Sequence, residues 1–268
     1  TRETPEGTIN YGLGDWVFYK MQTPNEFTST CYYYLLNLYL ARFKGLAGQD
    51  GHQYAEKAAA LQQTIQQKFF NAAENLYANG SQAAQALALY LGIVPEQHER
   101  YVAANLSRLI HENNNHLDFG MLGSKTVLRM LAKYGYVDQA LDMALQKDAP
   151  SWANWVEKGY TTPIETWVLS PDFRDASTNH VFLGDINAWM YNCLAGINYD
   201  DARPGFVHTR IEPYFPRQLS WVKARYQSPS GEICSEWKRT GGTIRLKVSI
   251  PVNTTATIVL KGEKREVG

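Results

Sequence analysis

Residues 54–69, Tyr-Ala-Glu-Lys-Ala-Ala-Ala-Leu-Gln-Gln-Thr-Ile-Gln-Gln-Lys-Phe, repeat an apolar side chain every three or four positions. This spacing places the apolar side chains on one stripe of an α-helix. The same periodicity continues to about residue 197 and predicts seven helices. The expected ranges are about 28–46, 53–70, 81–92, 95–114, 121–134, 136–147 and 180–196. The first and last of these are apolar nearly all round, which is typical of helices covered on both sides.

The period changes from 3.6 to 2 near residue 200. Residues 244–250, Ile-Arg-Leu-Lys-Val-Ser-Ile, alternate apolar and polar side chains, and residues 256–260 repeat the pattern. Such alternation is typical of half-buried strands, and turn residues at 228–231, 240–242 and 251–253 divide them. We expect four to six antiparallel strands here. The chain is therefore predicted to be mainly α followed by β, with a helical domain over 1–200 and a C-terminal antiparallel β-sandwich domain over 201–268.

Composition and charge exclude several classes of function. The 26 Lys and Arg balance the 26 Asp and Glu, so no bulk charge favours nucleic acid or an anionic membrane, and no apolar run is long enough to span a membrane. The three cysteines and six histidines lack zinc-ligand spacing, and the chain lacks a nucleophile elbow, a phosphate loop and a dinucleotide motif. We therefore expect no metal and no cofactor, and a periplasmic, secreted or cytoplasmic location stays open.

One acid, Glu165, stands among side chains suited to a sugar. It lies in residues 159–167, Gly-Tyr-Thr-Thr-Pro-Ile-Glu-Thr-Trp, which are followed by residues 177–180, Ser-Thr-Asn-His. A carboxylate that takes a proton from water beside a pyranose needs aromatic faces and short polar side chains around it. The alternative is that Glu165 is a surface acid in a loop and that the tryptophans belong to the core.

This segment belongs to a connection of more than thirty residues between two helices. The connection contains Pro150-Ser-Trp152 and ends with Asn179 and His180, at the start of the last predicted helix. A connection of that length inside a compact domain is usually functional. His180 could instead be an ordinary residue at a helix start, bonded to a carbonyl group.

A second candidate is the glycine-rich loop Gly12-Leu-Gly-Asp-Trp16, which precedes the first predicted helix. The glycines allow a tight turn that would leave Asp15 and Trp16 exposed, a carboxylate beside a ring that can stack on a sugar. The alternative is a local helix cap combined with a packed aromatic ring.

Together these segments resemble the C-terminal part of the α-L-rhamnosidases of glycoside hydrolase family 78, over nearly the whole chain. The tail from 205 to 260 is similar to that family's terminal β-domain. The matching segments occur in the family's order: Gly14-Asp15-Trp16, Thr23-Pro24, Gly120-Met-Leu-Gly123, Pro150-Ser-Trp152, Gly159 to Trp167 and Ser177 to His180. The segment 159–167 departs from the family pattern at Tyr160, Ile164 and Thr166, so the pocket wall and the tuning of the acid are expected to differ.

The resemblance implies a partial (α/α)6 toroid, about seven of twelve helices, and hydrolysis of terminal α-L-rhamnose with inversion. Glu165 then stands at the general-base position. Trp16 and His180 fall on positions that line the rhamnose pocket, with Asp15, Trp152 and Asn179 as neighbours. The general acid is expected upstream of this chain, which would make the chain a fragment. Its partners would be a rhamnose-containing glycan or glycoside and the remainder of the toroid, in the same or another chain.

Two alternatives remain open from the sequence. One is another (α/α)6 glycosidase or a phosphorylase that acts on glucosides or fucosides. The other is a non-catalytic sugar-binding or scaffold relative that kept the toroid and lost the acid.

Overall fold

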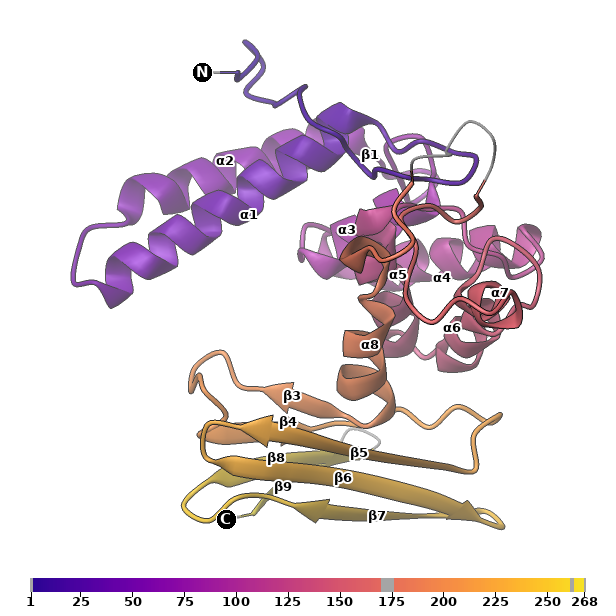
Figure 1. The fold of residues 1–268 in the computed structure, drawn as a ribbon. Helices are drawn as coiled ribbons and strands as arrows, with labels where there is room; N and C mark the ends of the chain where they lie inside the picture. Colours follow the sequence, from indigo (N-terminus) through magenta and orange to yellow (C-terminus); the bar gives the residue numbers. More distant parts are fainter. Residues whose placement is uncertain (1, 170–175, 261–262, 268) are drawn as a thin grey trace. The chain divides into compact units, whose positions relative to one another are not determined.

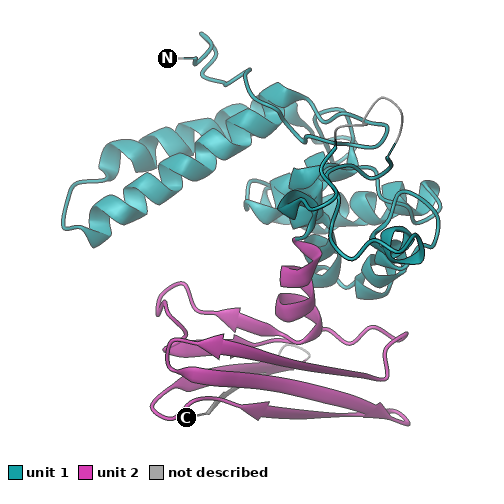
Figure 2. Ribbon diagram, viewed as in Figure 1, with its two compact units in different colours: residues 1–184 teal, residues 185–268 magenta. Residues whose placement is uncertain are grey.

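The computed structural model describes residues 2–169, 176–260 and 263–267, and a helical part is followed by β-sheets (Figure 1). This order confirms the prediction of a chain that is mainly α and then β. The chain divides into two compact units, residues 1–184 and 185–268 (Figure 2). The division falls before the predicted boundary at residue 200, because the last helical segment packs with the sheets that follow it.

The first unit contains the first six predicted helices, each within a few residues of its expected range. They are α1 (Asn25–Leu46), α2 (His52–Phe69), α3 (Gln82–Tyr90), α4 (Glu96–Glu112), α5 (Met121–Lys133) and α6 (Val137–Ala144). A two-stranded hairpin that the sequence analysis did not predict, β1 (Phe70–Asn71) and β2 (Leu76–Tyr77), follows α2.

Successive helices of the first unit pack in pairs. Helix α1 packs against α2, α3 against α4, and α5 against α6, while α3 also packs against α5. The apolar stripes predicted from the 3.6 period form these contacts: Leu61 and Ile65 of α2 are buried, as are Leu106 and Ile110 of α4. Contacts of α3 with α1 and α5 connect the three pairs.

Two helix predictions need correction. The connection after α6 contains a short helix, α7 (Trp152–Glu157), whose first turn is capped by the Ser151 hydroxyl accepting the Asn154 amide at 3.1 Å. The helix predicted at 180–196 is broken into a 3₁₀ turn, η2 (Val181–Leu183), and a helix, α8 (Ile186–Trp189), that continues as the π-helix η3 (Met190–Leu194). Gly184 separates the two pieces, and glycine is a poor helix former.

Helix α1 was expected to be covered on both sides, and within this chain it is not. Five apolar side chains spaced by three and four residues remain between 42% and 76% exposed, a surface that we call the α1 stripe. Tyr39 and Phe43 stack on this surface with their ring centroids 5.8 Å apart. The α1 stripe consists of Leu36, Tyr39, Leu40, Phe43 and Leu46.

The second unit contains α8, η3 and two sheets. One sheet has the order β3-β4-β8-β9, and the other has the order β5-β6-β7. The strands are β3 (Ile197–Tyr199), β4 (His208–Ile211), β5 (Trp221–Ser228), β6 (Gly231–Thr240), β7 (Thr243–Ser249), β8 (Thr255–Leu260) and β9 (Glu263–Val267). The expectation of only antiparallel strands is wrong, because β4 and β8 are parallel. Strands β5, β6 and β7 form the crossover that separates these two in sequence.

The two sheets share one core. Ile197 and Ile211 from the first sheet and Ile233 from the second are buried in the same cluster. Leu246 and Val248, from the alternating stretch that predicted β7, pack against it. The period-2 pattern therefore predicted correctly which side chains of β7 face inward.

Candidate active site

Two stretches of the connection after α6 run side by side and bring Glu165 to His180. The Glu165 amide donates to the Ser177 carbonyl at 2.9 Å, and the His180 amide donates to the Pro163 carbonyl at 2.9 Å. The Thr162 hydroxyl also donates to the Thr178 carbonyl. Residues 170–175, which lie between the two stretches, are outside the described part of the chain. These hydrogen bonds between the two stretches explain how the side chains of Glu165 and His180 become neighbours.

The described hydrogen bonds of the Glu165 carboxylate involve one of its two oxygens. Its Oε2 accepts the Ser177 amide at 2.9 Å and lies 3.7 Å from Nδ1 of His180. The side chains of Glu165 and His180 are 28% and 23% exposed. Within the described part of the chain, Oε1 accepts no hydrogen bond. One oxygen is therefore fixed by a backbone amide, while the other has no hydrogen-bond partner among the described residues.

The His180 ring faces the acid and an aromatic neighbour. Its centroid lies 4.4 Å from that of Phe182, edge to face, and Phe182 is 45% exposed. No hydrogen bond from this imidazole to a carbonyl group occurs among the described residues. Asn179 is exposed, and its amide donates to the Ser177 hydroxyl at 3.2 Å. Sequence reasoning missed Phe182, whose only signal is its position two residues after His180.

The tryptophans of this segment are core residues, as the alternative interpretation proposed. The Trp167 ring lies 5.0 Å from that of Trp152 and 5.1 Å from that of Trp155, and all three are at most 6% exposed. The Trp152 indole donates to the Leu183 carbonyl at 2.8 Å, and that of Trp167 donates to the Phe119 carbonyl. Trp152 therefore offers little surface to a sugar, and the cluster instead anchors the segments on both sides of Glu165 and His180.

The expected exposure of Asp15 is wrong, since only 1% of this residue is exposed. Its carboxylate accepts the amides of Gly120, Leu122 and Gly123 at 2.7 to 3.1 Å, which caps the start of α5. Burial raises the pKa of Asp15, and the three amide donors oppose that shift. Glycine provides space for this contact, because a Cβ atom on Gly120 would lie 2.0 Å from the Trp16 carbonyl oxygen.

Trp16 is exposed as predicted, at 41%. Its carbonyl accepts the Met121 amide at 3.0 Å, so the loop that carries the indole is bound to the start of α5. Phe119, just before that start, lies 5.9 Å ring to ring from Trp167, two residues after Glu165. A chain of packed residues thus connects the Trp16 loop to the segment that carries the acid.

Neither a metal site nor a membrane span occurs in the described residues. They contain no group of three or more His, Cys, Asp or Glu side chains that could hold an ion. None of the described helices is long and apolar enough to cross a bilayer.

Comparison with known families decides the relationship. Residues 1–194 match the model of the bacterial alpha-L-rhamnosidase 6 hairpin glycosidase domain, and residues 196–268 match that of the bacterial alpha-L-rhamnosidase C-terminal domain. The chain belongs to the bacterial α-L-rhamnosidase family. The family predicted from the ordered motifs is thereby confirmed.

Individual α-L-rhamnosidases resemble the chain over most of its length. The enzyme of Streptomyces avermitilis is 29% identical over 253 residues, which are 92% of this chain and 24% of the relative. Its crystal structure in complex with L-rhamnose has a TM-score of 0.89 at 27% identity and covers 96% of this chain and 25% of that one. The native enzyme of Aspergillus terreus has a TM-score of 0.90 at 26% identity and covers 99% of this chain and 33% of that one. The chain therefore spans about a quarter of the length of the curated relative it matches.

Proposed function

We propose that the protein containing this chain hydrolyses terminal α-L-rhamnosyl bonds with inversion, and that Glu165 is the general base. The observation that carries the proposal is the partly exposed Glu165 carboxylate, with Oε2 fixed by the Ser177 amide and Oε1 without a partner among the described residues. A general base needs this combination of fixed orientation and an open oxygen that can take a proton from the attacking water. The rhamnose-bound relative supports the choice of sugar.

In this proposal, three side chains of the motifs bind the sugar. His180, 3.7 Å from the carboxylate, and the exposed Asn179 can bond hydroxyl groups, while the exposed Trp16 indole can stack on the C–H face of a ring. Asp15 and Trp152 act differently in this proposal: they hold the loop and the connection in place. Inverting hydrolysis also requires a carboxylic acid on the other side of the bond, roughly 6.5–9.5 Å from the base. We assign it to residues outside this chain.

We also propose that the helical unit is part of an (α/α)6 toroid and that the second unit is a β-sandwich. Three helix pairs and a matching family model described by six hairpins support the first. The α1 stripe supports it as well, since an exposed apolar surface of this kind marks an interface. The core shared by the two sheets supports the second. The remaining helices are the proposed cover of the α1 stripe.

A panel of nitrophenyl glycosides tests the reaction and the sugar. We expect the full-length protein to hydrolyse the α-L-rhamnoside and to leave the glucoside and the fucoside intact. Proton NMR during the first turnovers should show the β-anomer of rhamnose, because inversion at the anomeric carbon converts α into β. Initial release of the α-anomer would reject inversion. Hydrolysis of the glucoside or fucoside in place of the rhamnoside would support another toroid glycosidase, and absence of any hydrolysis would support the sugar-binding alternative.

A further inference from the structure

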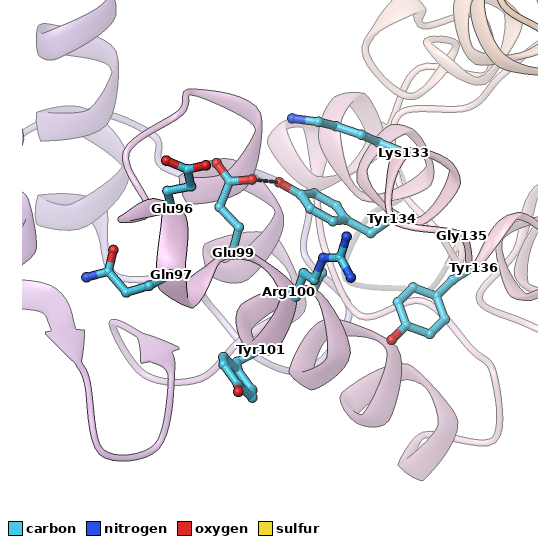
Figure 3. Close-up of a pocket in the computed structure, with 10 residues that line it drawn as sticks. Glu96, Gln97, Glu99, Arg100, Tyr101, Lys133, Tyr134, Gly135 and Tyr136 are labelled. Carbon is cyan, nitrogen blue, oxygen red and sulfur yellow. Dashed lines mark hydrogen bonds between the residues drawn. The ribbon is translucent and has the colours of Figure 1, made fainter. Parts of the chain in front are cut away.

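A hollow lies at the C-terminal end of α5. It opens between the first turns of α4 and the link from α5 to α6, with a volume of about 1280 Å³ (Figure 3). Helix α5 has 13 residues and is therefore roughly 20 Å long. Its N-terminal end contacts the Trp16 loop, and its C-terminal end borders the hollow. The hollow is thus separate from the candidate active site.

The lining of the hollow is polar and aromatic. It contains two acids, Glu96 and Glu99, and two bases, Arg100 and Lys133, so the charges balance. Among the described residues it holds no aliphatic side chain larger than alanine. Such a surface has no net attraction for an anion and little to offer an apolar ligand. It suits a neutral ligand that carries many hydroxyl groups.

The orientation of Tyr134 in the hollow is fixed by its neighbours. The Tyr134 hydroxyl donates to Glu99 at 2.7 Å, as the dashed line in Figure 3 shows. Burial and the neighbouring Glu99 raise the pKa of Tyr134, so that the hydroxyl stays protonated and keeps this bond. The Lys133 ammonium lies 5.1 Å from the centre of the Tyr134 ring. The ring orientation is therefore set before any ligand binds.

Arg100 is one of the donors in the lining of the hollow. It is exposed and makes no hydrogen bond or ion pair with the described residues. In Figure 3 its side chain extends toward the α5–α6 link, where Tyr134 and Tyr136 are placed. A guanidinium group presents five N–H donors in a plane, and a tyrosine ring beside it offers a flat apolar face. Sugar rings need both surfaces together.

We propose that this hollow is a second carbohydrate site that binds a neutral glycan chain away from the bond being cleaved. Tyr134 and Tyr136 provide the faces for sugar rings, and Arg100 and Glu96 bond the hydroxyl groups. The choice of a glycan rests on the proposed function. The site holds a polymeric substrate on the protein and takes no part in the cleavage of a small rhamnoside.

Affinity electrophoresis of the full-length protein tests the second site. The protein carries Glu165→Gln so that the polymer is not cut. The gel contains a soluble rhamnan, which is a neutral polymer of rhamnose, or polygalacturonate as an anionic comparison. We expect rhamnan to retard the protein, and we expect Arg100→Ala to weaken that binding about fivefold because a hydrogen-bond donor is lost. Tyr136→Ala should weaken it by a similar factor because a stacking face is lost.

The matched control is Arg108→Ala, which removes the same charge from α4 outside the hollow. Arg108 is paired with Glu112 on the exposed face of the helix, and its loss should change rhamnan binding by about twofold at most. Hydrolysis of nitrophenyl rhamnoside by the Arg100 and Tyr136 variants, with Glu165 intact, should equal that of the parent. Equal rhamnan binding by all variants, absence of retardation by rhamnan, or preference for polygalacturonate would overturn the proposal. Loss of small-rhamnoside hydrolysis in the parent would instead reject the proposed function.

Discussion

At the scale of single residues, the candidate site depends on hydrogen bonds that fix otherwise mobile groups. The Glu165 carboxylate accepts the backbone amide of Ser177, and its Oε2 lies 3.7 Å from Nδ1 of His180. Asp15 lies in the loop before α1, and its carboxylate accepts three backbone amides at the start of α5. Among the described residues, one oxygen of Glu165 has no hydrogen-bond partner, whereas both oxygens of Asp15 accept amides. The two acids of the sequence motifs therefore have different physical roles.

Asp15→Ala is expected to lower stability more than it alters sugar affinity. The substitution leaves buried amides at the start of α5 without an acceptor, which costs about 1–3 kcal/mol. The melting temperature of the full-length protein should fall, while the KM of any variant that folds should stay near that of the parent. A large rise in KM at an unchanged melting temperature would contradict the capping role.

Asp118→Ala is the control for Asp15. Its carboxylate also accepts two backbone amides, from Lys20 and Met21, but these bonds are exposed. Water can replace the lost acceptor there, so we expect a cost below about 1 kcal/mol. An equal loss of stability in both variants would contradict the argument that burial makes the Asp15 bonds important.

At the scale of helices and strands, amphipathic periodicity predicted the elements that bury one face. The stripe from Tyr54 to Phe69 predicted α2, and the alternation over 244–250 predicted β7. The segment 180–196 was predicted as one helix because apolar residues occur on both sides of Gly184. The helix breaks at this glycine. The parallel pairing of β4 with β8 could not be predicted, since alternation shows which face is buried and not which strand is the neighbour.

Phe43→Glu tests whether the α1 stripe is covered in the full-length protein. Phe43 is 58% exposed in this chain. If other helices cover it, the new charge is buried without a partner, and the stability of the protein should fall by more than about 2 kcal/mol. Thermal denaturation measures this loss.

The control for Phe43→Glu is Gln67→Glu, on the exposed face of α2. Surface substitutions of this kind usually change stability by no more than about 0.5 kcal/mol. A similarly small effect of Phe43→Glu would show that the α1 stripe is exposed to solvent, and the toroid proposal would then lose the support that it draws from this stripe.

At the scale of the whole molecule, the sequence predicted the order of helices and strands and the segments that meet near Glu165. The segments 159–167 and 177–180 carry the polar and aromatic residues that indicated the site, and both lie within the range that matches the family model. The sequence could not distinguish residues that face a sugar from residues that support them. Trp152 and Asp15 belong to the motifs as much as Trp16 does, yet only Trp16 is substantially exposed. Burial depends on contacts such as those of Gly120 with the Trp16 loop, which sequence spacing does not show.

The central claim is that Glu165 activates water in the hydrolysis of an α-L-rhamnoside. The most direct test is the turnover number of Glu165→Gln in the full-length protein, beside Glu157→Gln, a control on α7 whose exposed side chain pairs with Lys147. Loss of a general base should lower the turnover number by about 10²–10⁴-fold in the first variant, with an unchanged melting temperature, and the control should retain parental activity. Near-parental turnover by Glu165→Gln would contradict the account.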